Sequence, residues 1–189
     1  MNDALKDCAK DSVKDCATND SYGELIEPAT LRIIRVLPGP IERVWSYLTK
    51  EELRSQWMAS SSMEMAAGAP FEFVWRNHEF TKPPAALPPG VKEEYRMAST
   101  IIAFEPPHKL SFTWENSGNV TIELEPQGKD VQLTVIHRRL PNRTELLSVS
   151  AGWHKHLAIL LAVMSNQKVE PFWEEFLSLK EVYDKRLPV

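Results

Sequence analysis

The sequence predicts an α+β fold in which a curved antiparallel sheet of about six or seven strands wraps around one long C-terminal helix. The stretch 144–164 carries the longest helical pattern of apolar residues in the chain. Three consecutive strand-like segments with short turns precede it, which is typical of an antiparallel sheet. A helix with a wide apolar face must pack on another apolar surface, and the preceding sheet supplies one.

Composition places the chain among ordinary globular proteins and excludes several functional classes. With 189 residues, 43% hydrophobic and 25% charged, it can form one domain with a real core. A net charge of -4 argues against a nucleic-acid partner. We find no apolar run of the roughly 18 residues that a membrane span needs, and no apolar signal-peptide core. We therefore expect a cytoplasmic protein with no membrane partner.

The first 27 residues differ in composition from the rest of the chain. Lys-Asp pairs recur every four residues, and few apolar side chains are available for burial. We expect residues 1–27 to form a flexible charged tail, either a frayed helix or disordered. It holds Cys8 and Cys16, which on a helix would be about 12 Å apart. That separation is too long for a disulfide, so we expect reduced thiols and no metal site there.

The first half of the domain is expected to contain a strand, two short helices, a hairpin and a long loop. A strand is expected over 29–37, and Pro38, Gly39 and Pro40 end it. Two short helices follow, over 41–48 and 50–57. A hairpin is then expected, because apolar residues alternate from Met63 and again over 71–75 around a turn at 68–70. The proline-rich segment 78–92 is expected to be a loop, which either covers another part of the domain as a flap or is only flexible.

The second half is more regular. Strands are expected over 94–104, 110–114, 120–125 and 131–138, with turns at 116–119 and 127–130. The organising helix follows at 144–164. A last helix is expected over 171–187, with Phe172, Phe176, Leu179 and Tyr183 on its buried stripe.

This order of a strand, two short helices, a meander and a long C-terminal helix is a helix-grip plan. Its matching segments are 40–45, 53–57, 71–75, 104–114, 133–137 and 152–157. On these residues the chain resembles the SRPBCC (START/Bet v 1-like) superfamily. Within it, the chain is most similar to proteins with the domain named for the C-terminal half of the activator of Hsp90 ATPase.

The resemblance covers about residues 29–187. It implies a Bet v 1-like helix-grip domain over 28–166, followed by a helical extension over 167–189. It also implies a hydrophobic cavity between sheet and helix, often open at one end. The proline-rich loop and the charged tail have no counterpart in the family core.

Eight residues are candidates for lining that cavity because alternation and helical spacing turn them inward. They are Trp57, Phe73, Trp75, Phe112, Trp114, His137, Trp153 and Leu157. Ligand pockets are concave and mainly apolar with a few polar groups, a description that suits this set. The alternative for each is ordinary core packing. His137 is either the polar anchor of a pocket, a general base, or a core histidine bonded to backbone or water.

Other polar residues offer little chemistry. His154 and His156 are two positions apart, about 200° around a helix, so a shared metal is not expected. We expect His154 and Lys155 to be solvated and His156 to touch the rim of the groove. Glu93, Glu94 and Arg96 are expected at the surface. The sequence holds no nucleotide-binding, hydrolase or cysteine-nucleophile motif, so we assign no catalytic residue and expect no cofactor.

Three functions remain open from the sequence. The leading one is non-catalytic binding of a small hydrophobic or amphipathic ligand, because the inner face is aromatic with few polar groups. The second, implied by the resemblance, is a protein–protein module with a partner such as the chaperone Hsp90. The third is a cyclase-like or hydratase-like enzyme acting on a lipid-like or polyketide-like substrate, with His137 as the base.

Overall fold

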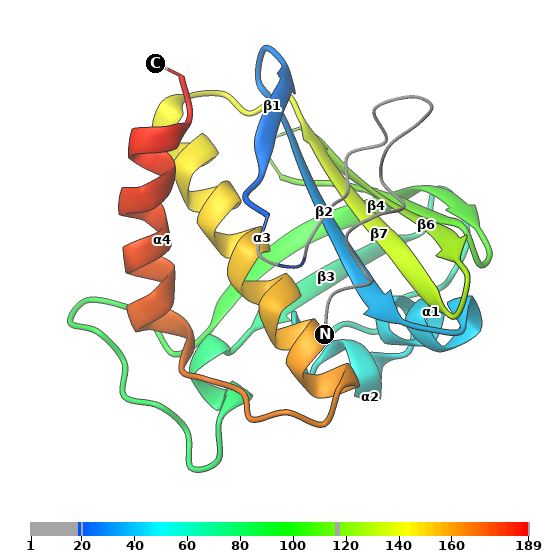
Figure 1. Cartoon of the computed structure of the whole chain (residues 1–189), viewed down its shortest axis with the longest axis horizontal. Helices are drawn as coiled ribbons and strands as arrows, with labels where there is room; N and C mark the ends of the chain where they lie inside the picture. The colour runs from blue at the N-terminus through cyan, green and yellow to red at the C-terminus, as the bar shows by residue number, and fades with distance from the viewer. Residues whose placement is uncertain (1–18, 20, 116–117, 189) are drawn as a thin grey trace, which may run out of the picture.

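A computed structural model describes residue 19, residues 21–115 and residues 118–188 of the chain. In this part, seven strands form one antiparallel sheet that curves around a long helix (Figure 1). The elements are β1 Glu24–Glu27, β2 Thr30–Pro38, α1 Ile41–Thr49, α2 Glu51–Arg54, β3 Pro70–Trp75, the 3₁₀ turn η1 Asn77–Phe80, β4 Tyr95–Glu105, β5 Lys109–Thr113, β6 Asn119–Gln127, β7 Asp130–Arg138, α3 Arg143–Met164 and α4 Phe172–Arg186. The predicted fold class is confirmed.

The sheet order is β1-β2-β7-β6-β5-β4-β3, with antiparallel pairing throughout. Strands β4 to β7 form a consecutive meander, and β2 closes against β7 with Ile33 opposite Val135. Alternate residues of β2 are buried, including Leu31, Ile33 and Leu37. The two-residue period of the sequence therefore set the inner face of the sheet as expected.

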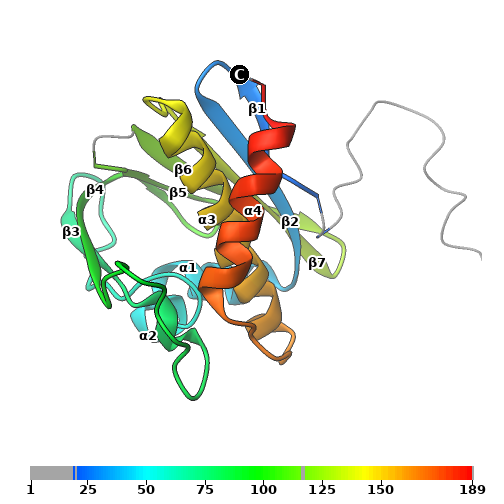
Figure 2. The same ribbon diagram turned by 90° about the vertical axis from the view of Figure 1, so that its left-hand side faces the viewer.

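Helix α3 lies in the concave face of the sheet, and α4 runs alongside it (Figure 2). The N-terminus of α3 is capped by the side chain of Asn142, which accepts a hydrogen bond from the backbone N–H of Glu145 at 2.9 Å. By length and composition alone α3 could cross a membrane. In its most apolar stretch, 61% of the residues are nevertheless buried within the domain, as is typical of a core helix.

The segment before β2 differs from the sequence expectation. Residues 24–27, placed in the flexible tail, form β1 at the edge of the sheet. The N–H of Gly23 donates to the hydroxyl of Tyr183 at 2.8 Å, and the N–H of Val36 donates to Oδ1 of Asn19. These contacts with β2 and α4 give the segment an order that its composition did not predict. Cys8, Cys16 and the rest of residues 1–18 lie outside the described residues.

The hairpin expected from Met63 is wrong in its first arm. Residues 61–65 form no strand, and only Ser60 makes a bridge, with Val74. Strand β3 pairs with β4 instead. The alternation around Met63 spans too few residues, between serines and alanines, to sustain a ladder. The second short helix is also shorter than expected, since it ends at Arg54 and leaves Trp57 in a turn.

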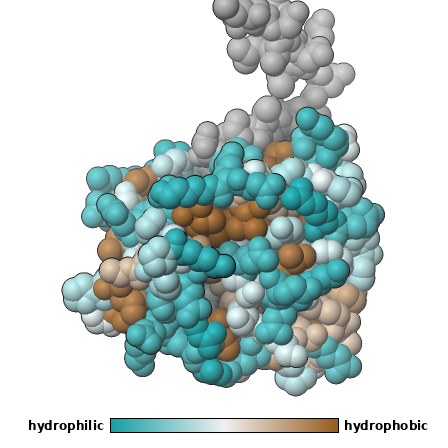
Figure 3. Space-filling model, turned by 90° about the horizontal axis from the view of Figure 1, so that it is seen from below, coloured by the Kyte–Doolittle hydropathy of each residue, from teal (hydrophilic) through white to brown (hydrophobic). Residues whose placement is uncertain are grey.

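Seen from below the view of Figure 1, the surface is mostly polar, with hydrophobic residues gathered in a few patches (Figure 3). This distribution is normal for a globular domain.

Candidate functional site

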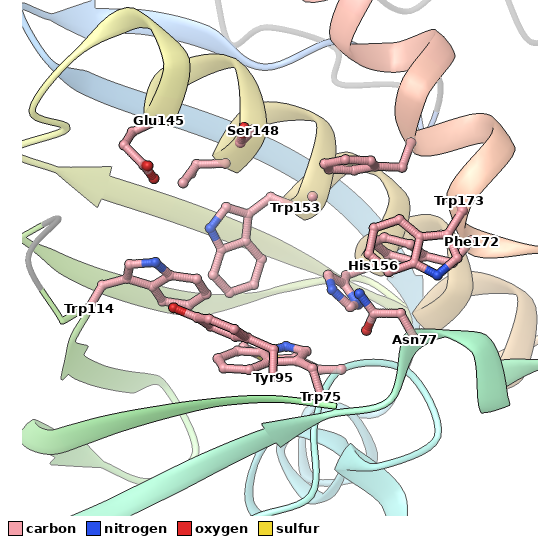
Figure 4. Close-up of a pocket in the computed structure, with 14 residues that line it drawn as sticks. Trp75, Asn77, Tyr95, Trp114, Glu145, Ser148, Trp153, His156, Phe172 and Trp173 are labelled. Atoms are coloured by element: carbon pink, nitrogen blue, oxygen red, sulfur yellow. The ribbon is translucent and has the colours of Figure 1, made fainter. Parts of the chain in front are cut away.

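A cavity of about 300 Å³ lies between the β3–β5 end of the sheet and the two C-terminal helices. Its wall is mainly aromatic (Figure 4). The aromatic lining residues are Trp75, Tyr95, Trp114, Trp153, Phe172, Trp173 and Phe176. Ligand pockets in proteins begin at about this volume and have this kind of lining.

Four of these rings follow one another along the cavity. The ring centroids of Tyr95 and Trp75 are 5.8 Å apart, those of Trp75 and Trp114 5.7 Å, and those of Trp114 and Trp153 5.6 Å. These separations are typical of favourable aromatic pairs. Trp75 ends β3, Tyr95 begins β4, Trp114 follows β5 and Trp153 comes from α3. The sheet and the helix thus share one continuous aromatic surface.

His156 supplies a polar group at one end of this surface. Its Nδ1 lies 2.7 Å from the carbonyl oxygen of Trp57, so Nδ1 carries the hydrogen and donates it. Burial lowers the pKa of His156 to about 4, against the opposing effect of this hydrogen bond. The imidazole is therefore neutral at pH 7, with Nε2 as a hydrogen-bond acceptor.

The opposite end of the cavity is acidic. Figure 4 shows Glu145 and Trp114 at this end, while Asn77, His156 and Trp173 gather at the other. The hydroxyl of Tyr95 donates to Oε2 of Glu115 at 3.0 Å. Burial raises the pKa of Tyr95, and Glu115 and Glu145 raise it further. A tyrosine phenol is protonated at neutral pH in any case, and this shift favours its role as a donor further.

Three of the eight residues predicted for the cavity line it, namely Trp75, Trp114 and Trp153. The other five are buried in the core around it: Trp57, Phe73, Phe112, His137 and Leu157. Trp57, for example, is fully buried and donates its Nε1–H to the carbonyl of Tyr47 at 2.9 Å. Alternation correctly turned these side chains inward. How closely α3 packs against the sheet then decides which of these side chains line the cavity and which are buried in the core.

His137 supports the cavity wall from behind. It is 0% exposed, and its Nδ1 accepts a hydrogen bond from Nε1 of Trp153 at 3.3 Å. The Trp114 ring lies 5.2 Å from the imidazole, centroid to centroid. His137 therefore holds two cavity tryptophans in place without lining the cavity, a position that does not suit a general base.

Sequence reasoning missed most of the polar lining. It left out Asn77, Glu145, Ser148 and the aromatic groups of α4, and it placed His156 only at the rim of the groove. A signal for part of this set was present, because Val149, Gly152, Trp153 and His156 follow the three-and-four spacing of one helix face. No local pattern indicated Asn77, which comes from the 3₁₀ turn η1 after β3.

Two expectations for α3 were wrong because α4 covers one of its faces. Lys155 is 2% exposed and forms an ion pair with Glu175 of α4. His154 is half-buried, with its Nδ1 3.0 Å from the hydroxyl of Tyr183. Burial, with smaller effects from Arg35 and Lys155, lowers the pKa of His154 to about 4.

The charged residues near β4 lie outside the cavity. Arg96 pairs with Glu72 and Glu94 on the exposed face of β3 and β4, as expected for surface groups. Across the part of the chain that the structure describes, no three or more His, Cys, Asp or Glu side chains are placed to hold a metal ion together.

Comparison with known protein families decides the identity of the domain. Residues 38–165 match the model of the activator of Hsp90 ATPase homolog 1-like proteins. The chain belongs to this family. The match ends just after α3, so helix α4 lies beyond it. Searching the curated proteins gave no match.

Solved structures show the same fold. A protein from Bordetella parapertussis, solved by NMR, is 32% identical with a TM-score of 0.74, and the alignment covers 90% of this chain and 92% of that one. CalU16 from Micromonospora echinospora is 19% identical with a TM-score of 0.61, covering 82% and 86%. DynU16, a putative protein in the dynemicin biosynthetic locus, is 20% identical with a TM-score of 0.58, covering 74% and 48%. The last two likenesses concern fold alone.

Proposed function

We propose that this family member binds a small, largely apolar molecule in the cavity beside α3. The observation that carries the proposal is the row of four aromatic rings, which faces an open space of about 300 Å³ instead of a filled core. Aromatic walls stabilise a flat apolar ligand through area burial and ring contacts. Asn77, Ser148 and His156 provide the few polar groups that such sites use for orientation.

The proposed role is binding without covalent catalysis. Ser148 and His156 are the aliphatic hydroxyl and the imidazole of the lining, and they are eight residues apart on one helix. That spacing corresponds to a rise of about 12 Å, far beyond the hydrogen-bond reach that a nucleophile and its base require. The enzyme hypothesis that relied on His137 loses its base, because that imidazole lies behind the cavity wall.

Gly152 allows a direct test of the cavity. It lines the open space, and a Cβ added there would meet no atom within 4 Å apart from the local helix backbone. The variant Gly152→Leu should therefore place its side chain in the cavity without a backbone clash. Because leucine favours helices more than glycine, the fold should be retained or stabilised by about 0.5–1 kcal/mol.

The experiment titrates the neutral apolar probe N-phenyl-1-naphthylamine into the protein and follows probe emission and tryptophan quenching. Wild type should bind, Gly152→Leu should lose binding, and the matched control Gly152→Ala should retain most of it. A folded Gly152→Leu variant that binds as tightly as wild type would contradict the proposal. Native mass spectrometry of freshly purified protein adds an independent search for a bound natural ligand.

The alternative is a protein–protein module with Hsp90 as its partner, in a protein that we also place in the cytoplasm. It predicts stimulation of the Hsp90 ATPase by wild type and by Gly152→Leu alike, because an outer surface would make the contact. Stimulation without probe binding would favour this alternative.

A further inference from the structure

Building on the proposed function, we infer that the cavity recognises a neutral ligand group that both donates and accepts hydrogen bonds, such as a hydroxyl or a carboxamide, and discriminates against carboxylates. The groups responsible are Asn77, His156 and Trp173, which gather at one end of the cavity (Figure 4). The aromatic row holds the apolar body of the ligand, and this polar end selects its head group.

Two of these groups have buried polar atoms without a protein partner. Among the described residues, Oδ1 of Asn77 and Nε1 of Trp173 are both buried and make no hydrogen bond. Native proteins rarely leave buried polar atoms unpaired, because each loses its bonds to water on folding. Both residues line this cavity and a smaller adjoining recess of about 240 Å³, whose lining also includes the oppositely charged pair of neighbours Lys92 and Glu93. A bound group placed between them would satisfy an acceptor and a donor together.

The third group, His156, has a fixed role. Its Nδ1–H is committed to the carbonyl of Trp57 at 2.7 Å, so the ring cannot turn to offer that hydrogen to a ligand. Phe80 and Phe172 pack against the imidazole and hold its orientation. Nε2 has no partner among the described residues and remains an acceptor.

The polar end therefore offers donors from Nε1 of Trp173 and the amide nitrogen of Asn77, and acceptors from Oδ1 of Asn77 and Nε2 of His156. A carboxamide complements this set with one carbonyl acceptor and two N–H donors, and a hydroxyl complements part of it. A carboxylate has no hydrogen to give to Nε2 of His156, and it would bury a charge beside that lone pair. The side chain of Asn77 can rotate, but His156 cannot, so His156 is the residue that discriminates.

The three groups come from separate parts of the chain. Trp173 belongs to α4, beyond residue 165 where the family match ends. Asn77 lies in the 3₁₀ turn that begins the proline-rich connection between β3 and β4. Of the three groups, His156 alone lies on α3, the helix around which the sheet is wrapped.

The test compares naphthalene-2-carboxamide, naphthalene-2-carboxylate and 2-methylnaphthalene by fluorescence titration at pH 7.5. These probes share one ring system and differ in their head group. Wild type should bind the carboxamide at least about tenfold more tightly than the carboxylate. The variants Trp173→Phe and Asn77→Leu should each weaken carboxamide binding about three- to tenfold and leave 2-methylnaphthalene nearly unchanged.

Two further variants sharpen the comparison. His156→Asn retains a donor for the Trp57 carbonyl and removes the acceptor at Nε2, so it should reduce the preference for carboxamide over carboxylate. Trp45→Phe is the matched control, because Trp45 packs against Phe104 of β4 and does not line the cavity. It should change no probe affinity.

The outcomes separate this inference from the proposed function. If all three probes bind with similar affinity, or Trp173→Phe weakens the carboxamide and 2-methylnaphthalene equally, the inference is wrong and the apolar cavity stands. If none of the probes binds to folded wild type, the proposed function fails and the inference fails with it.

Discussion

Nδ1 of His156 lies 2.7 Å from the carbonyl oxygen of Trp57, and this hydrogen bond ties the middle of α3 to the turn after α2. The two residues are 99 positions apart in the chain. Trp57 is fully buried, and His156 is buried beneath the aromatic groups at the start of α4. The contact therefore sets both the tautomer of the imidazole and the depth of the cavity at its polar end.

The burial of His156 should make stability depend on pH. Its pKa is about 4 in the folded protein and 6.5 in a solvated histidine, so the unfolded state binds the proton more readily between these values. The free energy of unfolding should be highest above pH 6.5 and fall as pH drops toward 4. Between pH 7 and pH 5 this residue should account for a loss of about 2 kcal/mol.

Urea unfolding of wild type and His156→Asn at pH 7, 6 and 5 measures this contribution. The variant should lose less stability over the range. His154, whose pKa is also lowered to about 4, is present in both proteins, so its effect cancels in the comparison. Parallel pH profiles would show that His156 titrates normally in the folded state.

Two tryptophans should respond differently to truncation. Trp57 is fully buried, so Trp57→Ala should cost about 3–5 kcal/mol of unfolding free energy. Trp114 is half-buried and faces the cavity, so its ring has fewer contacts to lose and Trp114→Ala should cost less than about 2 kcal/mol. Chemical denaturation of both variants makes the measurement. If both variants lost about 3–5 kcal/mol of unfolding free energy, Trp114 would be a core residue that faces no open space.

The ion pair between Lys155 and Glu175 should stabilise the packing of α4 on α3. The Lys155 side chain is 3% exposed and that of Glu175 47% exposed, so Glu175→Gln leaves a buried ammonium without its carboxylate. Allowing for solvent at the glutamate, we expect a loss of about 1–2 kcal/mol. Glu174→Gln changes an exposed neighbour and should cost less than about 0.5 kcal/mol. Similar values for the two variants in urea unfolding would contradict this role.

Truncation from the N-terminus should show where the folded domain begins. Deleting residues 2–18 should shift the melting midpoint by no more than about 2 °C, because the segment offers little apolar surface to bury. Deleting residues 2–27 also removes β1 and the hydrogen bond from Gly23 to Tyr183, and should lower the midpoint by clearly more. Differential scanning calorimetry compares the two. A large loss on the shorter deletion would show that the tail docks on the domain.

Local sequence patterns determined most of the fold. Val131, Leu133, Val135 and His137 alternate in the sequence and all face inward in β7, because a strand turns successive side chains to opposite faces. The long apolar pattern of α3 likewise required a sheet to cover it. The main exceptions are β1, the segment around Met63 and the shortened helix α2. At β1 the strand is held by contacts with β2 and α4, and around Met63 the alternation was too short to form one.

Only the tertiary structure decided which inward residues meet open space. Phe112 and Trp114 share one face of the β5 segment, yet Phe112 is core and Trp114 lines the cavity. Lys155 and His156 are adjacent on α3, yet Lys155 pairs with α4 and His156 bonds to the turn after α2. Periodicity records the direction of a side chain from its own backbone. The shape of a cavity depends on how closely separate elements approach, and that distance is set by packing between residues far apart in the chain.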